Sequence, residues 1–83
     1  MALRVEYSRA GDAAYIYLRT VEPGGAVRQE IVGGVAEGNV ILDFDADGRL
    51  VGIEVLDASR FLPPGVIAAA DSIDEKPPSG SSA

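Results

Sequence analysis

Cysteine and histidine are both absent from this sequence of 83 residues. Without cysteine, the chain cannot form a disulfide, a thiolate nucleophile or a cysteine-ligated metal site. Without histidine, it lacks the commonest general base and the commonest ligand of transition metals. The serine hydroxyls therefore have no evident base to activate them as nucleophiles. We expect a protein that is not an enzyme and that carries no cofactor.

Basic residues are also scarce, because seven lysines and arginines stand against thirteen acidic residues and leave a net charge of −6. That balance argues against nucleic-acid binding, which depends on basic side chains that neutralise phosphates. It argues equally against docking on an anionic membrane surface. No apolar run approaches the roughly 18 residues that span a bilayer, and the opening MALRVEYSR lacks the apolar region of a signal peptide. The expectation is a soluble, cytoplasmic protein.

Much of the chain alternates between apolar and polar residues, the pattern of half-buried strands. Five such segments are separated by turn-forming residues: LRVEY (3–7), AAYIYLRT (13–20), AVRQEIV (26–32), VILDF (40–44) and LVGIEVL (50–56). In the third segment, Val27 and Ile31 are expected to point inward, with Arg28 and Glu30 outward. Five short strands with short connections predict a mainly β fold of the β-rich α+β kind, a five-stranded antiparallel meander.

The character of the sequence changes after Leu56. Asp57 or Ser59 is expected to cap a short helix through ASRFL, which two prolines would end. A second short helical segment, PGVIAAAD, would lay an apolar side on the sheet. The final residues are polar and rich in proline, glycine and serine, a composition typical of disorder. The predicted organisation is one small domain over residues 1–71 and a disordered tail over 72–83.

The stretch DFDADGRLVGIE, residues 43–54, matches the calcium-loop pattern of an EF-hand at every specified position. An EF-hand needs a helix on each side of its loop. The residues before Asp43 are rich in glycine and β-branched side chains, which disfavour a helix. Asp47-Gly48 is instead a common two-residue hairpin turn. The segment is therefore predicted to be a β-hairpin.

Closure of this hairpin would gather six apolar side chains on one face, in the pairs Phe44–Val51, Leu42–Ile53 and Val40–Val55. A three-residue loop without a bulge would mix the two faces, so the pattern favours a turn of even length. Asp43, Asp45 and Glu54 would share the other face, where a weak divalent-cation site is the alternative function. The competing interpretation is that Asp45 bonds to turn amides and that Asp43 and Glu54 are solvated.

Two segments, VEYSRAGDAAYIYL and VILDFDADGRLVGIEVLDAS, together resemble the small bacterial family called domain of unknown function 2283. The resemblance covers roughly residues 3–62, and Ser8 stands where the family more often has aspartate. The matching residues are Tyr7, Asp12, Ala13, Tyr15, Ile16, Leu18, Leu42, Asp43, Asp45, Gly48, Gly52, Ile53, Glu54, Ala58 and Ser59. The resemblance implies a small β-rich domain. It also implies an antitoxin-type partner, because some members of the family are encoded beside toxin-like proteins.

Carboxylates are the only remaining candidates for catalysis. Asp12 ends the turn between the first two strands, where it is expected to bond to nearby backbone amides. Glu30 and Glu54 could in principle form a carboxylate pair for acid–base chemistry. Such chemistry needs a pocket with a volume on the order of 300 Å³ or more, and five short strands leave little room for one.

Association with another protein is the function that the sequence favours. Tyr15 and Tyr17 share a strand face, and tyrosine is favoured at the centres of interfaces, although both rings could equally cover one side of a thin sheet. Ile41 and Leu50 are expected on the second face of the sheet, where exposed apolar patches commonly mark interfaces. The prediction is a homodimer or a heteromeric protein partner, with the sheet or its edge strand as contact. No small-molecule substrate is identified.

Overall fold

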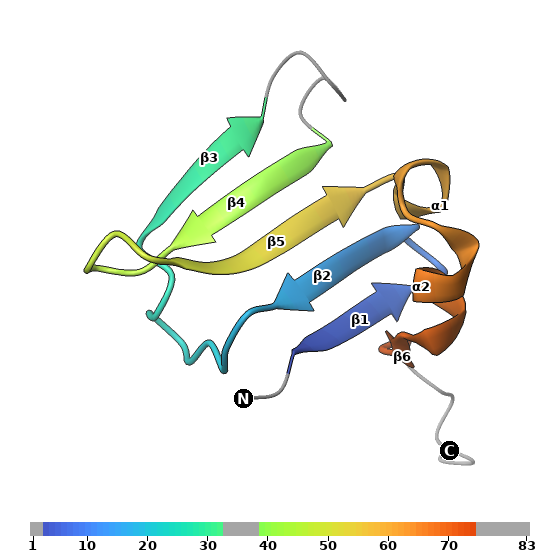
Figure 1. Cartoon of the computed structure of the whole chain (residues 1–83), viewed down its shortest axis with the longest axis horizontal. Coiled ribbons are helices and arrows are strands. Elements are labelled where there is room, and N and C mark those ends of the chain that lie inside the picture. Colours follow the sequence, from blue (N-terminus) through green and yellow to red (C-terminus); the bar gives the residue numbers. More distant parts are fainter. Residues whose placement is uncertain (1–2, 33–38, 75–83) are drawn as a thin grey trace.

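The computed structural model of the protein describes residues 3–32 and 39–74, which form one sheet and two short helices (Figure 1). The mainly β fold expected from the sequence is confirmed, and the sheet gains a sixth strand. In chain order the elements are β1 (Arg4–Ser8), β2 (Ala13–Tyr17), β3 (Arg28–Val32), β4 (Val40–Phe44), β5 (Leu50–Leu56), α1 (Ala58–Phe61), α2 (Pro64–Ala69) and β6 (Asp71–Ser72). Within these ranges, no helix is long and apolar enough to cross a membrane.

The strands stand in the order β3-β4-β5-β2-β1-β6. β1 pairs with β2, and β3, β4 and β5 form a meander, all antiparallel. β5 takes the place beside β2, so that β3 lies at the far edge, which corrects the simple meander predicted above. β5 is the longest strand, and its Val51, Gly52 and Val55 are buried. A central position therefore removes much apolar surface from water.

The core lies between the sheet and the helices. Ala14 of β2, Val55 of β5 and Ala58 of α1 are buried together, and partly buried side chains pack on them: Tyr7, Ile53, Leu62 and Ile67. α1 contacts β2, and α2 contacts β1. Figure 1 shows both helices at the end of the sheet where β5 leads into α1, and neither helix lies beside β3.

β4 and β5 form the hairpin predicted for the EF-hand-like segment, because both flanks of the turn are strands. Two of the predicted pairs are confirmed, Val40–Val55 and Leu42–Ile53. The third is wrong, since Phe44 pairs with Leu50 and not with Val51. The shift in register marks a β-bulge, at which Val51 is the extra residue of the longer strand.

The turn of this hairpin is a three-residue loop and not the even-length turn that was predicted. The Asp45 N–H donates to the Arg49 carbonyl at 2.9 Å, and the Gly48 N–H donates to the Asp45 carbonyl at 3.0 Å. A two-residue type I′ turn would need positive φ at both central residues, but Gly48 has φ 83° while Asp47 does not have positive φ. The bulge at Val51 compensates for the odd loop, because one extra residue restores the two faces farther along the strands.

The first helix falls where it was predicted, and Asp57 occupies its N-cap position, but neither predicted side chain makes the capping bond. Asp57 has a left-handed backbone, with φ 55°, and its side chain makes no capping bond. The Asp12 carboxylate instead accepts a hydrogen bond from the Ser59 N–H at 3.0 Å. The Asp12 carbonyl accepts another from the Ala58 N–H at 2.9 Å. A residue of the β1–β2 turn, far away in the sequence, thus satisfies the first amides of α1.

The domain continues further toward the C-terminus than predicted. β6 adds to β1 as a parallel strand. The Asp74 carboxylate then accepts hydrogen bonds from the Ser8 hydroxyl at 2.8 Å and from the Arg9 N–H at 2.9 Å. The boundary predicted at residue 71 is therefore too early, because the fold includes the residues through Asp74. The rest of the predicted tail, residues 75–83, lies outside the described residues.

Candidate functional site

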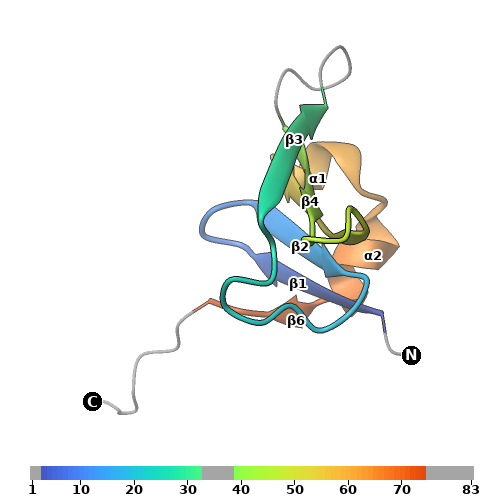
Figure 2. The same ribbon diagram turned by 90° about the vertical axis from the view of Figure 1, so that its left-hand side faces the viewer.

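The two faces of the sheet differ in what covers them. The helices pack over the face that carries Ala14 and Val55, and Figure 2 shows both helices on one side of the sheet. The opposite face is called the open face below. Strand pairing places on it Glu6, Tyr15, Tyr17, Gln29, Ile31, Ile41, Asp43 and Glu54.

A buried carboxylate lies at the centre of the open face. Asp43 is only 5% exposed, and both of its oxygens accept hydrogen bonds. Tyr15 Oη donates to Oδ2 at 2.6 Å, and Gln29 Nε2 donates to Oδ1 at 2.9 Å. These donors compensate for the water that a buried charge loses. Burial, and then the bond to Asp43, raises the pKa of Tyr15, so its hydroxyl remains a donor.

Tyr15 can reach Asp43 because Gly52 leaves room for its ring. Gly52 pairs with Asp43 of β4 on one side and with Tyr17 of β2 on the other. A Cβ atom at residue 52 would lie 2.0 Å from Tyr15 Oη and 2.4 Å from Tyr15 Cζ. Any side chain there would displace the ring and break its hydrogen bond. Glycine is therefore required for this close approach of a side chain to the strand.

A second polar cluster continues from Tyr15 toward β1. The rings of Tyr15 and Tyr17 meet edge to face with centroids 4.6 Å apart, an arrangement that aromatic pairs prefer. Tyr17 Oη donates to Glu6 at 2.8 Å, and this bond raises the pKa of Tyr17. The Arg4 guanidinium lies 4.2 Å from the centre of the Tyr17 ring and 3.4 Å from the Glu6 carboxylate. Both tyrosines are thus held in defined orientations.

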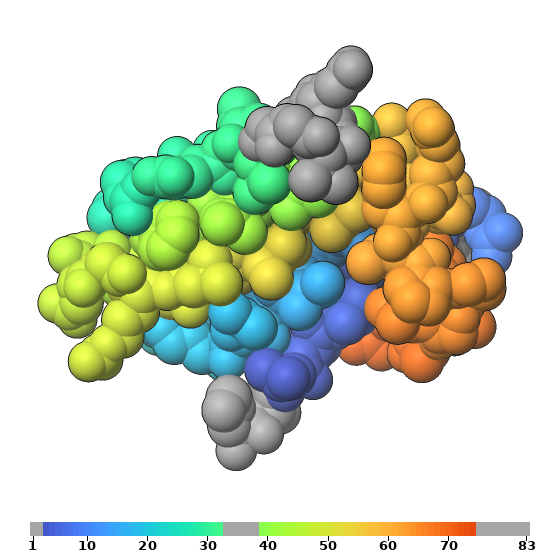
Figure 3. Space-filling model, turned by 45° about the horizontal axis from the view of Figure 1, so that its top comes forward, coloured from blue at the N-terminus to red at the C-terminus, as the bar shows by residue number. Residues whose placement is uncertain are grey.

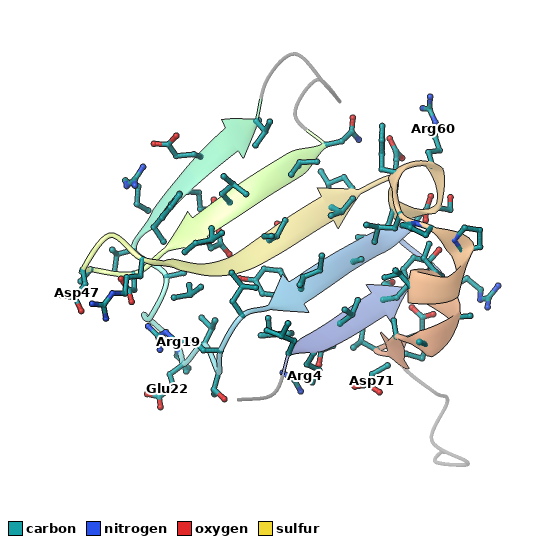
Figure 4. All side chains as sticks on the ribbon, in the orientation of Figure 1. Arg4, Arg19, Glu22, Asp47, Arg60 and Asp71 are labelled. Carbon is teal, nitrogen blue, oxygen red and sulfur yellow. The ribbon has the colours of Figure 1, made fainter. Side chains whose placement is uncertain are left out.

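Asp45 holds the hairpin turn together. Its Oδ1 accepts the N–H groups of Asp47 and Arg49, each at 2.9 Å, which is the turn role expected from the sequence. Its Oδ2 accepts a hydrogen bond from Arg19 at 2.9 Å, and Figure 4 shows Arg19 and Asp47 at the same end of the sheet. The bond from the Arg49 backbone contributes most to holding the pKa of Asp45 below its ordinary value.

The three carboxylates predicted as a cation site do not form a common site. Asp43 is buried and bonded to two side chains, and Asp45 is bonded to the turn and to Arg19. Glu54 lies opposite Ile41 in the strand pairing. Across residues 3–32 and 39–74, no three acidic side chains are grouped so as to hold a metal ion. The geometry therefore gives the alternative function no support.

Three of the four residues predicted for an interface, Tyr15, Tyr17 and Ile41, lie on the open face and are partly exposed. Leu50 does not lie beside them, which corrects its predicted position. It pairs with Phe44, and Phe44 alternates with the residues of the open face along β4. The bulge is the physical reason, because it shifts the register of β5 between the turn and the rest of the strand.

The expectation that Val27 and Ile31 point inward is wrong. Ile31 is 66% exposed and Val27 is 59% exposed, because β3 is the outermost strand and Ile31 pairs with Ile41 on the open face. Alternation separates the two faces of a strand but does not tell which of them the core covers. Gln29 escaped notice for a related reason. Its role depends on its pairing with Asp43, which no local pattern reveals.

A third polar cluster joins the β1–β2 turn to α1. The Asp12 carboxylate accepts hydrogen bonds from Tyr7 Oη at 2.8 Å, from Ser59 Oγ at 2.7 Å and from the Ser59 N–H at 3.0 Å. The bond from the Ser59 hydroxyl contributes most to lowering the pKa of Asp12, and the bond to Asp12 raises the pKa of Tyr7. An open hollow of about 550 Å³ lies beside this cluster, and Arg9 and Ile67 form part of its wall.

The clusters of Asp12 and Asp43 contain many of the residues that carry the family resemblance: Tyr7, Asp12, Tyr15, Asp43, Gly52 and Ser59. Comparison with protein families gives a match over residues 4–59 to the family described as "Protein of unknown function (DUF2283)". Comparison with curated proteins and with solved structures gives no match. Because the family match spans well over half of the chain and includes both clusters, this protein is a member of the DUF2283 family.

Proposed function

We propose that this protein acts by protein–protein contact, with a second copy of the chain as its first partner and with β3 as the contact strand. The free edge of β3 is the observation that carries the proposal. Within the described part of the chain, β3 pairs with β4 alone. Its outer backbone groups are therefore available to another strand. An antitoxin-type partner, as the family resemblance implies, would use the same surface.

The two edges of the sheet are protected to different degrees. β6 closes one edge with two residues, and a very short edge strand offers little backbone for pairing. β3 leaves five residues along the other edge and contains neither proline nor lysine, and its two charged residues, Arg28 and Glu30, have opposite signs. Natural sheets commonly use proline, lysine and short strands to prevent pairing of their edges. The contrast supports β3 as the edge that accepts a partner.

Apolar side chains accompany this free edge. Val27 and Ile31 are largely exposed, and the neighbouring Ile41 is partly exposed. Figure 3 shows β3, in green, along one boundary of the molecule and away from the helices, in orange. Addition of a strand combines main-chain hydrogen bonds with contacts between alternate side chains. An added strand would therefore cover both the backbone edge and these apolar groups.

The polar clusters support a structural role, and we propose no catalysis at them. Asp12 accepts three hydrogen bonds, and its lowered pKa makes it a poor base at neutral pH. The Ser59 hydroxyl donates to this weakly basic carboxylate, so it lacks the activation that a nucleophile needs. The cytoplasmic location expected from the sequence is part of the same proposal.

Sedimentation equilibrium of the purified protein over a wide concentration range tests the proposal. We expect the mass to rise above that of the 8.6 kDa monomer as the concentration increases. Ile31→Lys places a charge on the free edge and is expected to weaken association. Leu3→Lys is the matched control, because Leu3 is 64% exposed but precedes β1 at the other side of the sheet.

Two outcomes would contradict this proposal. A wild-type protein that remains monomeric at the highest concentration would overturn self-association. Equal weakening by Ile31→Lys and Leu3→Lys would mean that association depends on exposed apolar side chains in general and not on the edge of β3.

A further inference from the structure

We propose that two copies of this chain join edge to edge through β3 in one register, antiparallel about a two-fold axis at Gln29. The inference rests on the proposed function and specifies the geometry of that contact. Two-fold dimers use the same patch on both copies, so a contact strand must be complementary to itself. β3 and the residue before it, with the sequence VRQEIV, meet this requirement in a single register.

With the axis at Gln29, Arg28 of one copy faces Glu30 of the other, and Val27 faces Ile31. Symmetry makes each of these pairs occur twice. Val27 immediately precedes β3, and its N–H donates to the carbonyl of Phe44 at 2.9 Å, although Phe44 already pairs with Arg28. Val27 therefore stays beside β4 but joins the regular pairing only in the proposed dimer. Opposite charges and apolar side chains that face each other directly across a sheet both stabilise strand pairing. In this register, each of the four side chains that flank Gln29 faces a partner of opposite charge or of apolar character.

The pleat of the strand agrees with this register. Residues two apart share a face, so Gln29 and Ile31 belong to the open face, and Arg28 and Glu30 belong to the other. The proposed register places Val27 on the open face as well, opposite Ile31. Each facing pair then joins residues of the same face. The apolar pairs extend the open face across the axis, and the ionic pairs lie on the reverse side.

The charges near the axis form a closed arrangement. Arg28 and Glu30 already form an ion pair within one chain, and both side chains are half exposed or more. In the dimer, the two Arg28 and two Glu30 side chains alternate around a square. Each charge has an opposite charge along its own strand and another across the axis, while like charges occupy the longer diagonals. Such a network keeps the ion pair within each chain and adds two ion pairs between the chains.

The neighbouring registers lack this complementarity. A shift of the axis to a point between two residues would pair side chains of opposite faces, which the pleat forbids. An axis at Glu30 would bring the two Glu30 carboxylates against each other, and an axis at Arg28 would do the same with two guanidinium groups. Both shifts would also separate Val27 from Ile31.

Charge-reversal variants test the register. Arg28→Glu and Glu30→Arg each convert both facing ionic pairs into like charges, and each is expected to weaken self-association on the order of tenfold at low salt. An equimolar mixture of the two variants is expected to associate like the wild type, because every facing pair then joins glutamate with arginine. The double variant R28E/E30R is expected to recover self-association for the same reason.

The outcomes separate this inference from the proposed function. A wild-type protein that stays monomeric in sedimentation equilibrium would overturn both. If the wild-type protein associates, two results would overturn this register and leave the proposed function standing. One is that the charge-reversal variants associate as strongly as the wild type, and the other is that an equimolar mixture of weakened variants does not recover association. Restored association in the mixture also demonstrates that both variants fold.

A cross-linking experiment measures the position of the axis directly, since the chain has no cysteine of its own. Gln29→Cys places two thiols across the axis with Cβ atoms about 5 Å apart, and mild oxidation is expected to yield a covalent dimer. Ile31→Cys is the matched control, because its two thiols would lie about 13 Å apart along the strands, beyond the reach of a disulfide. Equal cross-linking of both variants would overturn the register.

Discussion

Gly52→Ala is expected to destabilise the fold, because the new methyl group would clash with the ring of Tyr15. The added methyl group would lie 2.0 Å from Tyr15 Oη and 2.4 Å from Tyr15 Cζ, far inside the contact distance of about 3.5–4.0 Å. The ring cannot simply move aside, because its hydroxyl is bonded to Asp43 at 2.6 Å and its neighbour Tyr17 packs against it. Relief of the clash requires Asp43, a buried carboxylate, to lose a donor.

The magnitude follows from that loss. A hydrogen bond to a charged group contributes about 1.5–3 kcal/mol, and overpacking costs about 1–3 kcal/mol. The two effects overlap in one rearrangement, so we expect the free energy of unfolding to fall by about 3 kcal/mol. A domain of 83 residues has a total stability on the order of 4–12 kcal/mol. Its melting temperature should therefore fall by more than about 10 °C.

A Tyr15→Ala background isolates the contact. Removal of the ring removes the three atoms that lie nearest to a methyl group at residue 52, and alanine in a strand is more stable than glycine by about 0.5–1 kcal/mol. Urea unfolding followed by circular dichroism on the wild type, both single variants and the double variant gives the coupling energy between the two sites. If Gly52→Ala costs the same in both backgrounds, the close approach to Tyr15 is not the reason for glycine at this position, and the reasoning is refuted.

Three further predictions concern the polar clusters. Asp12→Asn is expected to loosen α1, because the two Ser59 donors bond to different oxygens of Asp12 and an amide keeps only one acceptor oxygen; amide exchange at Ser59 should accelerate, whereas Asp47→Asn at the turn tip should leave it unchanged. The pKa values of Asp12 and Asp45 lie below the ordinary 3.8 in the folded state, so their contribution to stability is complete above about pH 5 and is lost as the pH falls through the folded values. Urea unfolding at a series of acidic pH values checks this, and stability that does not decline below pH 3.8 would contradict it. The pKa of Tyr15 lies above the ordinary 10.0, so its contribution is complete below that value and is lost as the pH rises beyond it, a decline that Tyr15→Phe should reduce.

Local pattern was sufficient to predict the strands and the hairpin. The five alternating segments correspond to β1 through β5, and both predicted helical segments are helical. The choice of a hairpin over an EF-hand depended on glycine and β-branched residues before Asp43, and those preferences act within a few residues of the chain. The facing of Asp43 and Gly52 was also predictable, because it follows from hairpin pairing alone.

The bulge shows where local pattern stops being sufficient. Alternation required that Leu42 and Ile53 share a face, and an even-length turn was the simplest way to satisfy it. The protein uses a three-residue loop and an extra residue, Val51, to reach the same pairing. Both solutions keep Leu42 and Ile53, and Val40 and Val55, in facing pairs, so the pattern of these residues does not distinguish them. The difference matters for Leu50, which the bulge moves away from the face predicted for it.

The sequence by itself determined which segments are strands, which are helices, and which residues of the hairpin share a face, because these depend on side-chain periods and on near neighbours. Only the tertiary structure decided that β5 lies beside β2, that Asp12 caps a distant helix, and that Ile31 remains exposed at a free edge. These features depend on which of the alternative strand orders buries the most apolar surface. The buried surface comes from residues far apart in the chain, so no local sequence pattern specifies the strand order.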